Sequence, residues 1–217
     1  MPIKISVVDD HPAIATSYKI AIEGLSLAKF AITIRYSIKE CYNAIFSDND
    51  VPDLLLIDLS MPPYREKNIT DGFELAQLIR QQFPKTKIII LTMHSSPLYI
   101  YSIMEKLKPE GFLIKSDVDL KEISDALKSI ISEGFYNSKT AKEIVTNVKK
   151  HAFCDDELNR NIIILTSKRH TNKEIAQALK ISESTVEKKK AQLKQHLGIE
   201  GSNDRKMTEV LTNLKLL

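Results

Sequence analysis

Cysteine is scarce in this 217-residue chain, which has only two, and long apolar runs are missing from its sequence. Its two cysteines, Cys41 and Cys154, lie far apart and have no CxxC or Cys/His ligand spacing around them. We therefore expect neither a zinc site nor a structural disulfide. No apolar run approaches the ~20 residues that a membrane-spanning helix needs. The start, from Met1 to Lys4, leads into a strand-like segment and does not have the pattern of a signal peptide. These absences predict a cytoplasmic protein with no membrane partner.

Charge is distributed unevenly along the chain. Residues 1–137 contain 15 Lys and Arg against 18 Asp and Glu, a net charge of −3. Residues 138–217 contain 16 Lys and Arg against 10 Asp and Glu, a net charge of +6. A small basic domain indicates a polyanionic partner, most often nucleic acid. A solvated lysine-rich surface would give the same charge balance.

Strand and helix patterns alternate through the first 137 residues. Five segments have the pattern of strands: residues 3–8, 30–36, 54–57, 88–91 and 112–114. Continuous apolar runs such as Leu54–Ile57 are typical of strands that are buried on both faces of a parallel sheet. Five strands alternating with five helices predict a doubly wound, flavodoxin-like α/β domain with a five-stranded parallel sheet in the order 2-1-3-4-5.

The rest of the chain has a different pattern. Residues 138–155 are mixed and mostly polar, and we interpret them as a linker that is partly helical. From about residue 156 the strand patterns disappear and three or four helical patterns follow. We therefore expect an α/β domain at residues 1–137, a linker at 138–155 and a small all-α domain at 156–217.

Polar side chains end four of the five predicted strands. Asp9 and Asp10 end the first strand, Asp58 the third, Thr92 the fourth and Lys115 the fifth. Because the carboxyl ends of parallel strands meet at one edge, and strands one and three are neighbours, these groups should converge. Acids often end strands merely as caps of the following helix. Five chemically matched groups at four strand ends favour a common site.

Three carboxylates close together repel one another and need a cation. Hard oxygen ligands favour Mg²⁺. The expected ligands are the carboxylates of Asp9, Asp10 and Asp58 and the backbone carbonyl of Ser60. Asp58 can then act as a nucleophile and form an aspartyl phosphate. Lys115 would supply positive charge to the phosphoryl oxygens, and the Thr92 hydroxyl would supply a hydrogen bond.

Four segments of the sequence resemble a known family. They are VVDDHP at residues 7–12, LIDLSMP at 56–62, ILT at 90–92 and GFLIK at 111–115. These motifs resemble the receiver of bacterial two-component response regulators, and the Asp-Asp-His-Pro start looks like the NarL/FixJ subfamily. The run from Asp58 through Phe83-Pro84 to Leu91-Thr92-Met93 is most similar to RcsB-type members.

The resemblance implies roles for the same residues. Asp58 would be the phosphorylation site, and Asp9 and Asp10 would be the metal acids. Thr92 and Phe112 would form a switch pair, in which phosphate draws the Thr92 hydroxyl inward and the Phe112 ring follows. A phenylalanine in place of the commoner tyrosine removes the hydroxyl that such a ring could use in a hydrogen bond.

The connection after the predicted phosphorylation site is longer than in most receivers. Residues 63–70 lie between Met61-Pro62 and Asp71-Gly72. Because this loop is next to Asp58, it could screen water or shape the choice of partner. Equally, it could be a tolerated surface insertion, since lengthening a loop costs little free energy.

The basic segment has the spacing of a helix-turn-helix. Thr171 and Glu174 form a predicted capping box, which opens a helix through about Leu179. A turn follows at residues 180–182, and a second helix runs from about Glu183 to Leu197. This spacing predicts a helix-turn-helix whose second helix enters the major groove.

A helical wheel assigns the polar residues of the second helix. With Val186, Leu193 and Leu197 inward, a polar set faces the opposite way. The residues expected at base edges or on the outward face are Ser184, Lys188, Gln192 and Gln195. Those expected at phosphates are Thr185, Lys189, Lys190 and Lys194.

The segments at residues 172–176 and 184–186 look like the LuxR-type output domain. Two positions depart from that family: Glu187 stands where a lysine is usual, and Arg169 where a glycine usually ends the preceding helix. Beyond Gly201, a last helix has its apolar residues at Met207, Val210, Leu211 and Leu214. Regulators of this kind usually bind double-stranded DNA as homodimers.

Three functions remain open at this point. The main hypothesis is a transcription regulator, not an enzyme, that receives a phosphoryl group from a sensor histidine kinase or a phosphotransfer protein. An aspartate-nucleophile phosphohydrolase would typically have an acid two positions after the nucleophile, where this chain has Ser60. A regulator that is independent of phosphorylation, or a protein-interaction adaptor, is suggested by the 63–70 loop and by Glu187.

Overall fold

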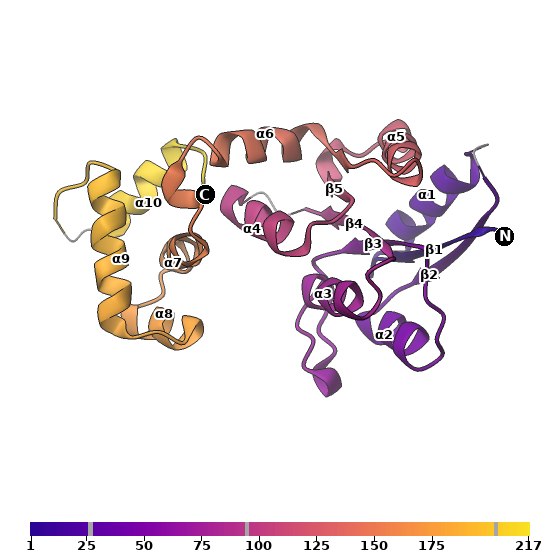
Figure 1. The fold of residues 1–217 in the computed structure, drawn as a ribbon, viewed down its shortest axis with the longest axis horizontal. Coiled ribbons are helices and arrows are strands. Elements are labelled where there is room, and N and C mark those ends of the chain that lie inside the picture. The colour runs from indigo at the N-terminus through magenta and orange to yellow at the C-terminus, as the bar shows by residue number, and fades with distance from the viewer. Residues whose placement is uncertain (26–27, 94–95, 202–203) are drawn as a thin grey trace. The chain divides into compact units, whose positions relative to one another are not determined.

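The computed structural model describes residues 1–25, 28–93, 96–201 and 204–217 (Figure 1). The chain divides into two compact units. One contains residues 1–94 and 106–141, and the other contains residues 95–105 and 142–217.

The first unit is built on a parallel sheet of six strands. They are β1 (Ile3–Val8), β2 (Phe30–Arg35), β3 (Leu54–Asp58), β4 (Lys87–Thr92), β5 (Gly111–Ile114) and β6 (Tyr136–Asn137). Their order is β2-β1-β3-β4-β5-β6, and every neighbouring pair is parallel. The predicted fold and the order of the first five strands are confirmed. The predicted count of five strands was wrong, because β6 has two residues and is too short to show a periodic pattern.

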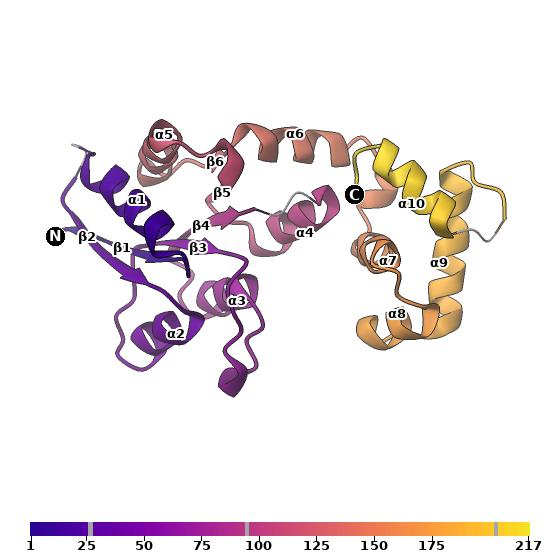
Figure 2. The same cartoon turned by 180° about the vertical axis from the view of Figure 1, so that it is seen from behind.

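Helices cover both faces of this sheet. They are α1 (Pro12–Glu23), α2 (Ile38–Phe46), α3 (Gly72–Gln82) and α5 (Leu120–Ile131), with the single turns η1 (Arg65–Lys67) and η2 (Lys115–Asp117). In Figure 1 and Figure 2, α1 and α5 lie side by side on one face, and α2 and α3 lie on the other. Helices on both faces explain why the central strands read as continuous apolar runs.

The core is formed by alternate strand residues that face opposite layers. Every residue of β3 is buried. Leu54 and Leu56 pack in one cluster with Ile123 and Leu127 of α5. Because successive side chains point to opposite faces, Leu55 is directed toward the other layer. Burial of these apolar side chains supplies most of the driving force for the fold, and it fixes the edge at which the strands end.

The second unit is helical among the residues that the structure describes. It contains α7 (Glu157–Ser167), α8 (Asn172–Leu179), α9 (Glu183–His196), α10 (Asp204–Asn213) and the turn η3 (Ala152–Cys154). It also takes in most of α6 (Lys139–Val148) and α4 (Pro97–Leu107) as far as Glu105. The predicted capping box is confirmed: the Glu174 N–H donates to the Thr171 hydroxyl, and the Thr171 N–H donates to the Glu174 carboxylate.

A buried arginine organises the interior of this second unit. The Arg160 guanidinium donates to the carbonyls of Cys154 and Asp155 at 2.6 and 2.9 Å, and to the Ser102 hydroxyl at 3.1 Å. It also lies over the Tyr101 ring, 5.4 Å from its centroid. A buried charge needs such a full set of hydrogen bonds, so Arg160 fixes these segments to one another.

Two features bear on the expectations about compartment and cysteine. Among the described residues, none of the helices has both the length and the apolar character that crossing a bilayer requires. Cys41 and Cys154 are free and buried, and burial raises the pKa of each thiol to about 12.

Candidate functional site

The polar groups that end the strands lie at one edge of the sheet. Asp9 follows β1, Asp58 ends β3, Thr92 ends β4 and Lys115 follows β5. The register aligns these ends, because Asp58 is opposite Leu91 and Thr92 is opposite Ile114. The strand ends of the parallel sheet therefore deliver the predicted groups to a common place.

Lys115 joins two of the acids directly. Its ammonium nitrogen lies 2.7 Å from Asp9 Oδ2 and 2.6 Å from Asp58 Oδ2. The three side chains are almost completely shielded, with exposed fractions of 5% for Lys115, 0% for Asp9 and 3% for Asp58. Two buried carboxylates thus share one ammonium group. This arrangement retains net negative charge at the strand ends.

The charge on Lys115 is stabilised by the acids around it. Burial alone would lower the pKa of Lys115, but the hydrogen bonds and charges of Asp58 and Asp9 outweigh burial and raise it. Burial and the charges of Asp9 and Asp58 also raise the pKa of Tyr18 on α1. Lys115 therefore remains cationic, and Tyr18 remains neutral, at any physiological pH.

The second oxygen of Asp58 is held by the chain that follows it. The Ser60 N–H donates to Asp58 Oδ1 at 3.1 Å, and Ser60 itself is exposed. The first residue of α3, Gly72, lies against the backbone of the same aspartate. A Cβ at Gly72 would lie 1.9 Å from the Asp58 carbonyl oxygen. Only glycine fits there, a requirement that sequence reasoning missed because it depends on tertiary packing.

The remaining acid is grouped with a histidine that sequence reasoning did not single out. Ligand atoms of Asp9, Asp10, His11 and Asp58 all lie within 4.8 Å of one another, and such a group could hold a metal ion. His11 Nδ1 lies 3.2 Å from Asp9 Oδ1 and 3.0 Å from Asp10 Oδ1. Among the described residues, the buried Asp10 Oδ1 has no hydrogen bond of good geometry. His11 could have been identified from the sequence, because it directly follows Asp9 and Asp10.

The predicted switch pair lies in the interior of the same sheet. Thr92 and Phe112 are both fully buried. Phe112 is opposite Ile90 on β4, two residues before Thr92. The Phe112 side chain is thus enclosed, as a core aromatic residue would be. Thr92 lies on the neighbouring strand.

The 63–70 loop is a folded hairpin. The N–H groups of Tyr64 and Ile69 each donate to the other's carbonyl, at 2.8 and 3.2 Å. Tyr64 packs edge-on against Tyr42 of α2, with 5.8 Å between ring centroids. Lys39 of α2 lies 3.4 Å from Glu66 at the tip of the hairpin. These contacts dock the loop on α2.

The helix-turn-helix of the second unit exposes one polar face of α9. Val186 and Leu193 are buried, as the wheel predicted, and Leu197 is partly buried. Four of the predicted DNA-contacting residues are exposed: Ser184, Lys188, Gln192 and Gln195. Thr185 is partly exposed. The structure thus offers a polar strip on α9 that other molecules can reach.

The three other predicted residues of α9 have partners within the chain. Lys189 forms an ion pair with Asp156. Lys190 and Lys194 lie 2.7 and 2.6 Å from the two carboxylate oxygens of Asp204, and their side chains are 5% and 9% exposed. A wheel of α9 could not show these pairs, because both acids lie outside that helix. The predicted phosphate contacts of these lysines stay predictions.

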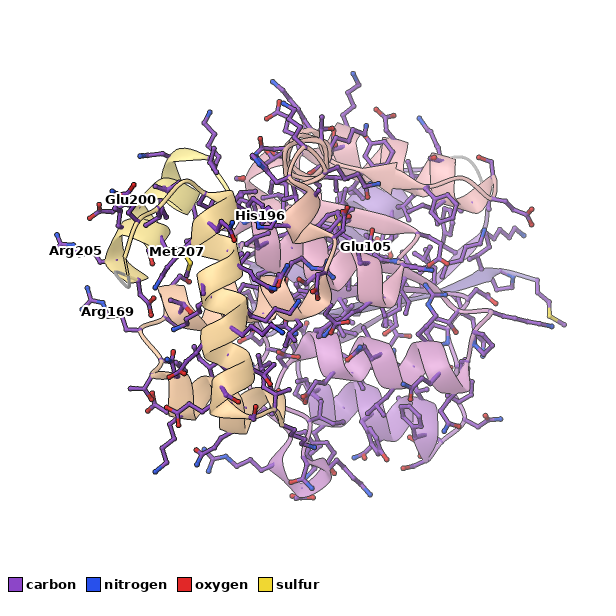
Figure 3. The ribbon with its side chains drawn as sticks, turned by 60° about the vertical axis from the view of Figure 1, so that its left-hand side comes forward. Glu105, Arg169, His196, Glu200, Arg205 and Met207 are labelled. Carbon is purple, nitrogen blue, oxygen red and sulfur yellow. The ribbon has the colours of Figure 1, made fainter. Side chains whose placement is uncertain are left out.

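The structure locates the two residues that depart from the LuxR-type pattern. Glu187 is exposed on α9. Arg169 follows α7 with a φ of 66°, in the left-handed region that favours glycine. Figure 3 shows Arg169 and Arg205 projecting away from the helices of this unit. The Arg169 side chain is exposed, so it adds no burial that would offset the cost of this backbone conformation.

Comparison with known proteins identifies the family. The response regulator receiver domain matches residues 5–128. The oxygen regulatory protein NreC of Staphylococcus carnosus (strain TM300) is 27% identical, with 99% of each chain covered. NreC of Staphylococcus haemolyticus (strain JCSC1435) is 26% identical, again with 99% of each chain covered.

Solved structures with the same fold cover the whole length. The RcsB–DNA complex aligns with a TM-score of 0.65 and 20% identity over 98% of both chains. RcsB from Salmonella enterica serovar Typhimurium, bound to a promoter in the presence of phosphomimetic BeF3−, aligns with a TM-score of 0.66 and 20% identity, covering 99% of this chain and 100% of that one. The resemblance predicted from the sequence is confirmed. Since the receiver family matches more than half of the residues, the chain belongs to the response regulators.

Proposed function

We propose that this response regulator is phosphorylated on Asp58 and controls transcription by binding DNA through its helix-turn-helix. A sensor histidine kinase or a phosphotransfer protein would donate the phosphoryl group. The observation that carries the proposal is the buried Lys115 ammonium, which lies 2.7 Å from Asp9 and 2.6 Å from Asp58. We assign the receiver to residues 1–137, the linker to 138–155 and the DNA-binding domain to 156–217.

The acids at the strand ends fit a divalent cation. We assign Mg²⁺ to the carboxylates of Asp9, Asp10 and Asp58 and to the Ser60 carbonyl. Two observations support the assignment: one ammonium neutralises only part of the carboxylate charge, and Asp10 Oδ1 has no well-formed hydrogen bond among the described residues. Hard oxygen donors favour Mg²⁺ over softer metals. When bound, Mg²⁺ neutralises charge on the transferring phosphoryl group.

Each residue of the site has its own role in phosphoryl transfer. A carboxylate oxygen of Asp58 attacks phosphorus, and an O–P bond forms as the donor's bond to phosphorus breaks and the leaving group takes the electron pair. The Lys115 ammonium stabilises the charge on the phosphoryl oxygens. The Thr92 hydroxyl moves inward and donates a hydrogen bond to one of the phosphoryl oxygens. The Phe112 ring follows this inward movement.

Incubation with acetyl phosphate and Mg²⁺, followed by intact mass measurement, tests this step. We expect one phosphate adduct in the wild type, none in Asp58→Asn, and an unchanged adduct in the control Asp48→Asn, which alters an exposed acid of the same unit. Steady release of phosphate without an adduct would favour the phosphohydrolase. Removal of Mg²⁺ by a chelator should abolish the adduct.

The exposed strip of α9 is the proposed DNA-reading surface. We assign Lys188, Gln192 and Gln195 to base edges, with Ser184 beside them, and Thr185 and Lys189 to phosphates. Lys190 and Lys194 are candidates for phosphate only if they leave Asp204. RcsB has been solved in complex with DNA, and as two dimers bound to two parallel DNAs. By that analogy the partners of this chain are double-stranded DNA and a second copy.

Fluorescence anisotropy with genomic promoter fragments tests this output. Beryllofluoride, a mimic of the phosphoryl group, should tighten binding by the wild type and have no effect on Asp58→Asn. DNA affinity that is the same in wild type and Asp58→Ala under phosphorylating conditions would favour a regulator independent of phosphorylation.

A further inference from the structure

The strand β6 leads to a serine that binds β5 with both its backbone and its side chain. The Ser138 N–H donates to the Phe112 carbonyl at 3.0 Å. The Ile114 N–H donates to Ser138 Oγ at 3.2 Å. The hydroxyl thus takes the place of the next backbone carbonyl at the point where the chain turns into α6. Ser138 is fully buried, so the residue before Lys115 is held by a contact that water does not weaken.

On the other side of Lys115, an aspartate binds the first turn of α6. Asp117 Oδ2 accepts the Thr140 N–H at 2.9 Å, and Asp117 Oδ1 accepts the Thr140 hydroxyl at 2.9 Å. The Ser138 side chain also helps to lower the pKa of Asp117. A carboxylate at a helix N-terminus binds an N–H that has no partner within the helix, and it interacts favourably with the helix dipole.

The charge state of Asp117 favours these contacts. Burial raises the pKa of Asp117, but the hydrogen bonds from Thr140 and Ser138 and the charge of Lys139 outweigh burial and hold the pKa below its usual value. Asp117 is therefore ionised at neutral pH and accepts charge-assisted hydrogen bonds, which are the strong kind.

The two sets of contacts enclose the turn that carries Lys115. Lys115 is the first residue of η2 and Asp117 the last, and the Val118 N–H donates to the Lys115 carbonyl at 3.3 Å. We infer that Ser138, Asp117 and Thr140 are positioning residues for Lys115, and that they couple the phosphorylation site to the beginning of α6. This inference rests on the proposed phosphorylation of Asp58.

The coupling must act in both directions, because energetic coupling between two sites is reciprocal. A looser η2 would misplace an ammonium group that must meet the phosphoryl oxygens closely. Conversely, a phosphoryl group on Asp58 gives Lys115 a new partner and stabilises one position of η2, and therefore of Asp117 and Thr140. Because α6 begins in the first unit and continues in the second, this helix is one covalent connection through which the change can leave the receiver.

The test compares three variants of full-length protein in the rate of adduct formation from acetyl phosphate and Mg²⁺. Thr140→Val removes the hydroxyl that donates to Asp117 and keeps the side-chain shape. It should slow the reaction about three- to tenfold, the size expected when one ordinary intramolecular hydrogen bond is lost, since the Thr140 N–H still binds Asp117. Thr140→Ser should restore the wild-type rate. The control Thr146→Val removes an exposed hydroxyl of the same helix, which donates to the Lys142 carbonyl at 2.8 Å, and should react as the wild type.

Two further measurements separate positioning from general damage. The apparent Mg²⁺ affinity of Thr140→Val should stay at the wild-type value, because the proposed ligands are untouched. Amide hydrogen exchange at the first turn of α6 should slow when beryllofluoride is added to the wild type, and Asp117→Asn should lose this response.

Each outcome bears on the inference. A wild type that forms the adduct while Thr140→Val and Asp117→Asn form it at the same rate overturns the inference alone. A parallel loss of Mg²⁺ affinity and rate in Thr140→Val also overturns it, since that result indicates a disrupted pocket. A wild type that forms no adduct overturns the proposed function and this inference with it.

Discussion

At the scale of single residues, the chemistry we assign to Asp58 depends on what holds its two oxygens. Lys115 binds one oxygen and the Ser60 N–H binds the other. The backbone of the same residue is in close contact with Gly72. The aspartate is therefore fixed by its neighbours before any donor arrives, which is the preorganisation that electrostatic catalysis requires.

The contact with Gly72 gives the first prediction. Gly72→Ala should cost about 1–3 kcal/mol of unfolding free energy, the usual penalty of overpacking, and it should slow phosphorylation because the Asp58 backbone must move. Gly24→Ala is the matched control, since its Cβ would lie at ordinary contact distances of 3.5 and 3.6 Å. Urea unfolding and intact mass measure the two effects. Equal behaviour of the two variants would contradict the assigned role of Gly72.

At the scale of secondary-structure elements, one aspartate holds α9 and α10 together. Asp204 opens α10 and binds Lys190 and Lys194, which are one helical turn apart on α9. The two lysines are buried, whereas the side chain of Asp204 is 42% exposed. One carboxylate therefore helps to fix the orientation of α9, the proposed DNA-reading helix, against α10.

Loss of that carboxylate should destabilise the second unit. Asp204→Asn leaves two buried ammonium groups without a counter-charge, and we expect a cost of about 1–3 kcal/mol, below the value for a fully buried pair because solvent screens Asp204. Chemical unfolding followed by circular dichroism measures this cost. Glu209→Gln, which removes an exposed partner of Arg205, should change stability by less than about 0.5 kcal/mol. If Asp204→Asn costs no more unfolding free energy than Glu209→Gln, the ion pairs of Asp204 do not hold α9 and α10 together.

The ion pairs of Asp204 with Lys190 and Lys194 also predict that the unfolding free energy depends on pH. Burial raises the pKa of Asp204, but the hydrogen bonds from Lys190 and Lys194 outweigh burial and lower it. A carboxyl whose pKa is depressed in the folded state contributes stability above its unfolded pKa of about 3.9, and loses it as the pH falls through the folded pKa. The unfolding free energy of the wild type should thus fall more steeply below about pH 4 than that of Asp204→Asn. Parallel curves would contradict this prediction.

A substitution in the turn after α7 should raise the thermal stability of the second unit. Arg169 has a left-handed backbone conformation, which costs a residue other than glycine about 1 kcal/mol. Arg169→Gly should therefore raise the thermal midpoint of the second unit. Lys168→Gly, at a position with a φ of −79°, should leave the midpoint unchanged or lower it. A gain from both substitutions, or from neither, would show that the φ angle is not the cause.

At the scale of the whole molecule, much of the fold follows from local patterns. The apolar runs of β3 and β4, and the acid, threonine and lysine at the strand ends, predicted the sheet order and the convergence on Lys115. The sequence could not reveal β6, because its two residues are too short for periodicity. The ion pairs of Asp204 were also hidden, because Asp204 lies on a different helix from the two lysines that it binds. Tertiary contacts of this kind decide which charges remain available for a partner.

The proposed output gives a prediction for the intact chain. Lys188→Ala should weaken binding to a specific promoter fragment by about 1–3 kcal/mol and relax base preference at one position, because a base-edge contact is lost. Lys121→Ala, an exposed lysine of α5, should bind as the wild type at the same salt concentration. Anisotropy titrations measure both. Equal affinities would remove Lys188 from the reading surface.

The identity of the phosphorylated residue is the most direct test of the whole account. Borohydride reduces an acyl phosphate to an alcohol, so reduction of the acetyl phosphate-treated protein followed by peptide sequencing marks the residue that carried the phosphoryl group. We predict that the modified residue is Asp58 and that the mark disappears when the protein is treated without Mg²⁺. A mark at another residue, or none in a protein that still responds to acetyl phosphate, would contradict the assignment.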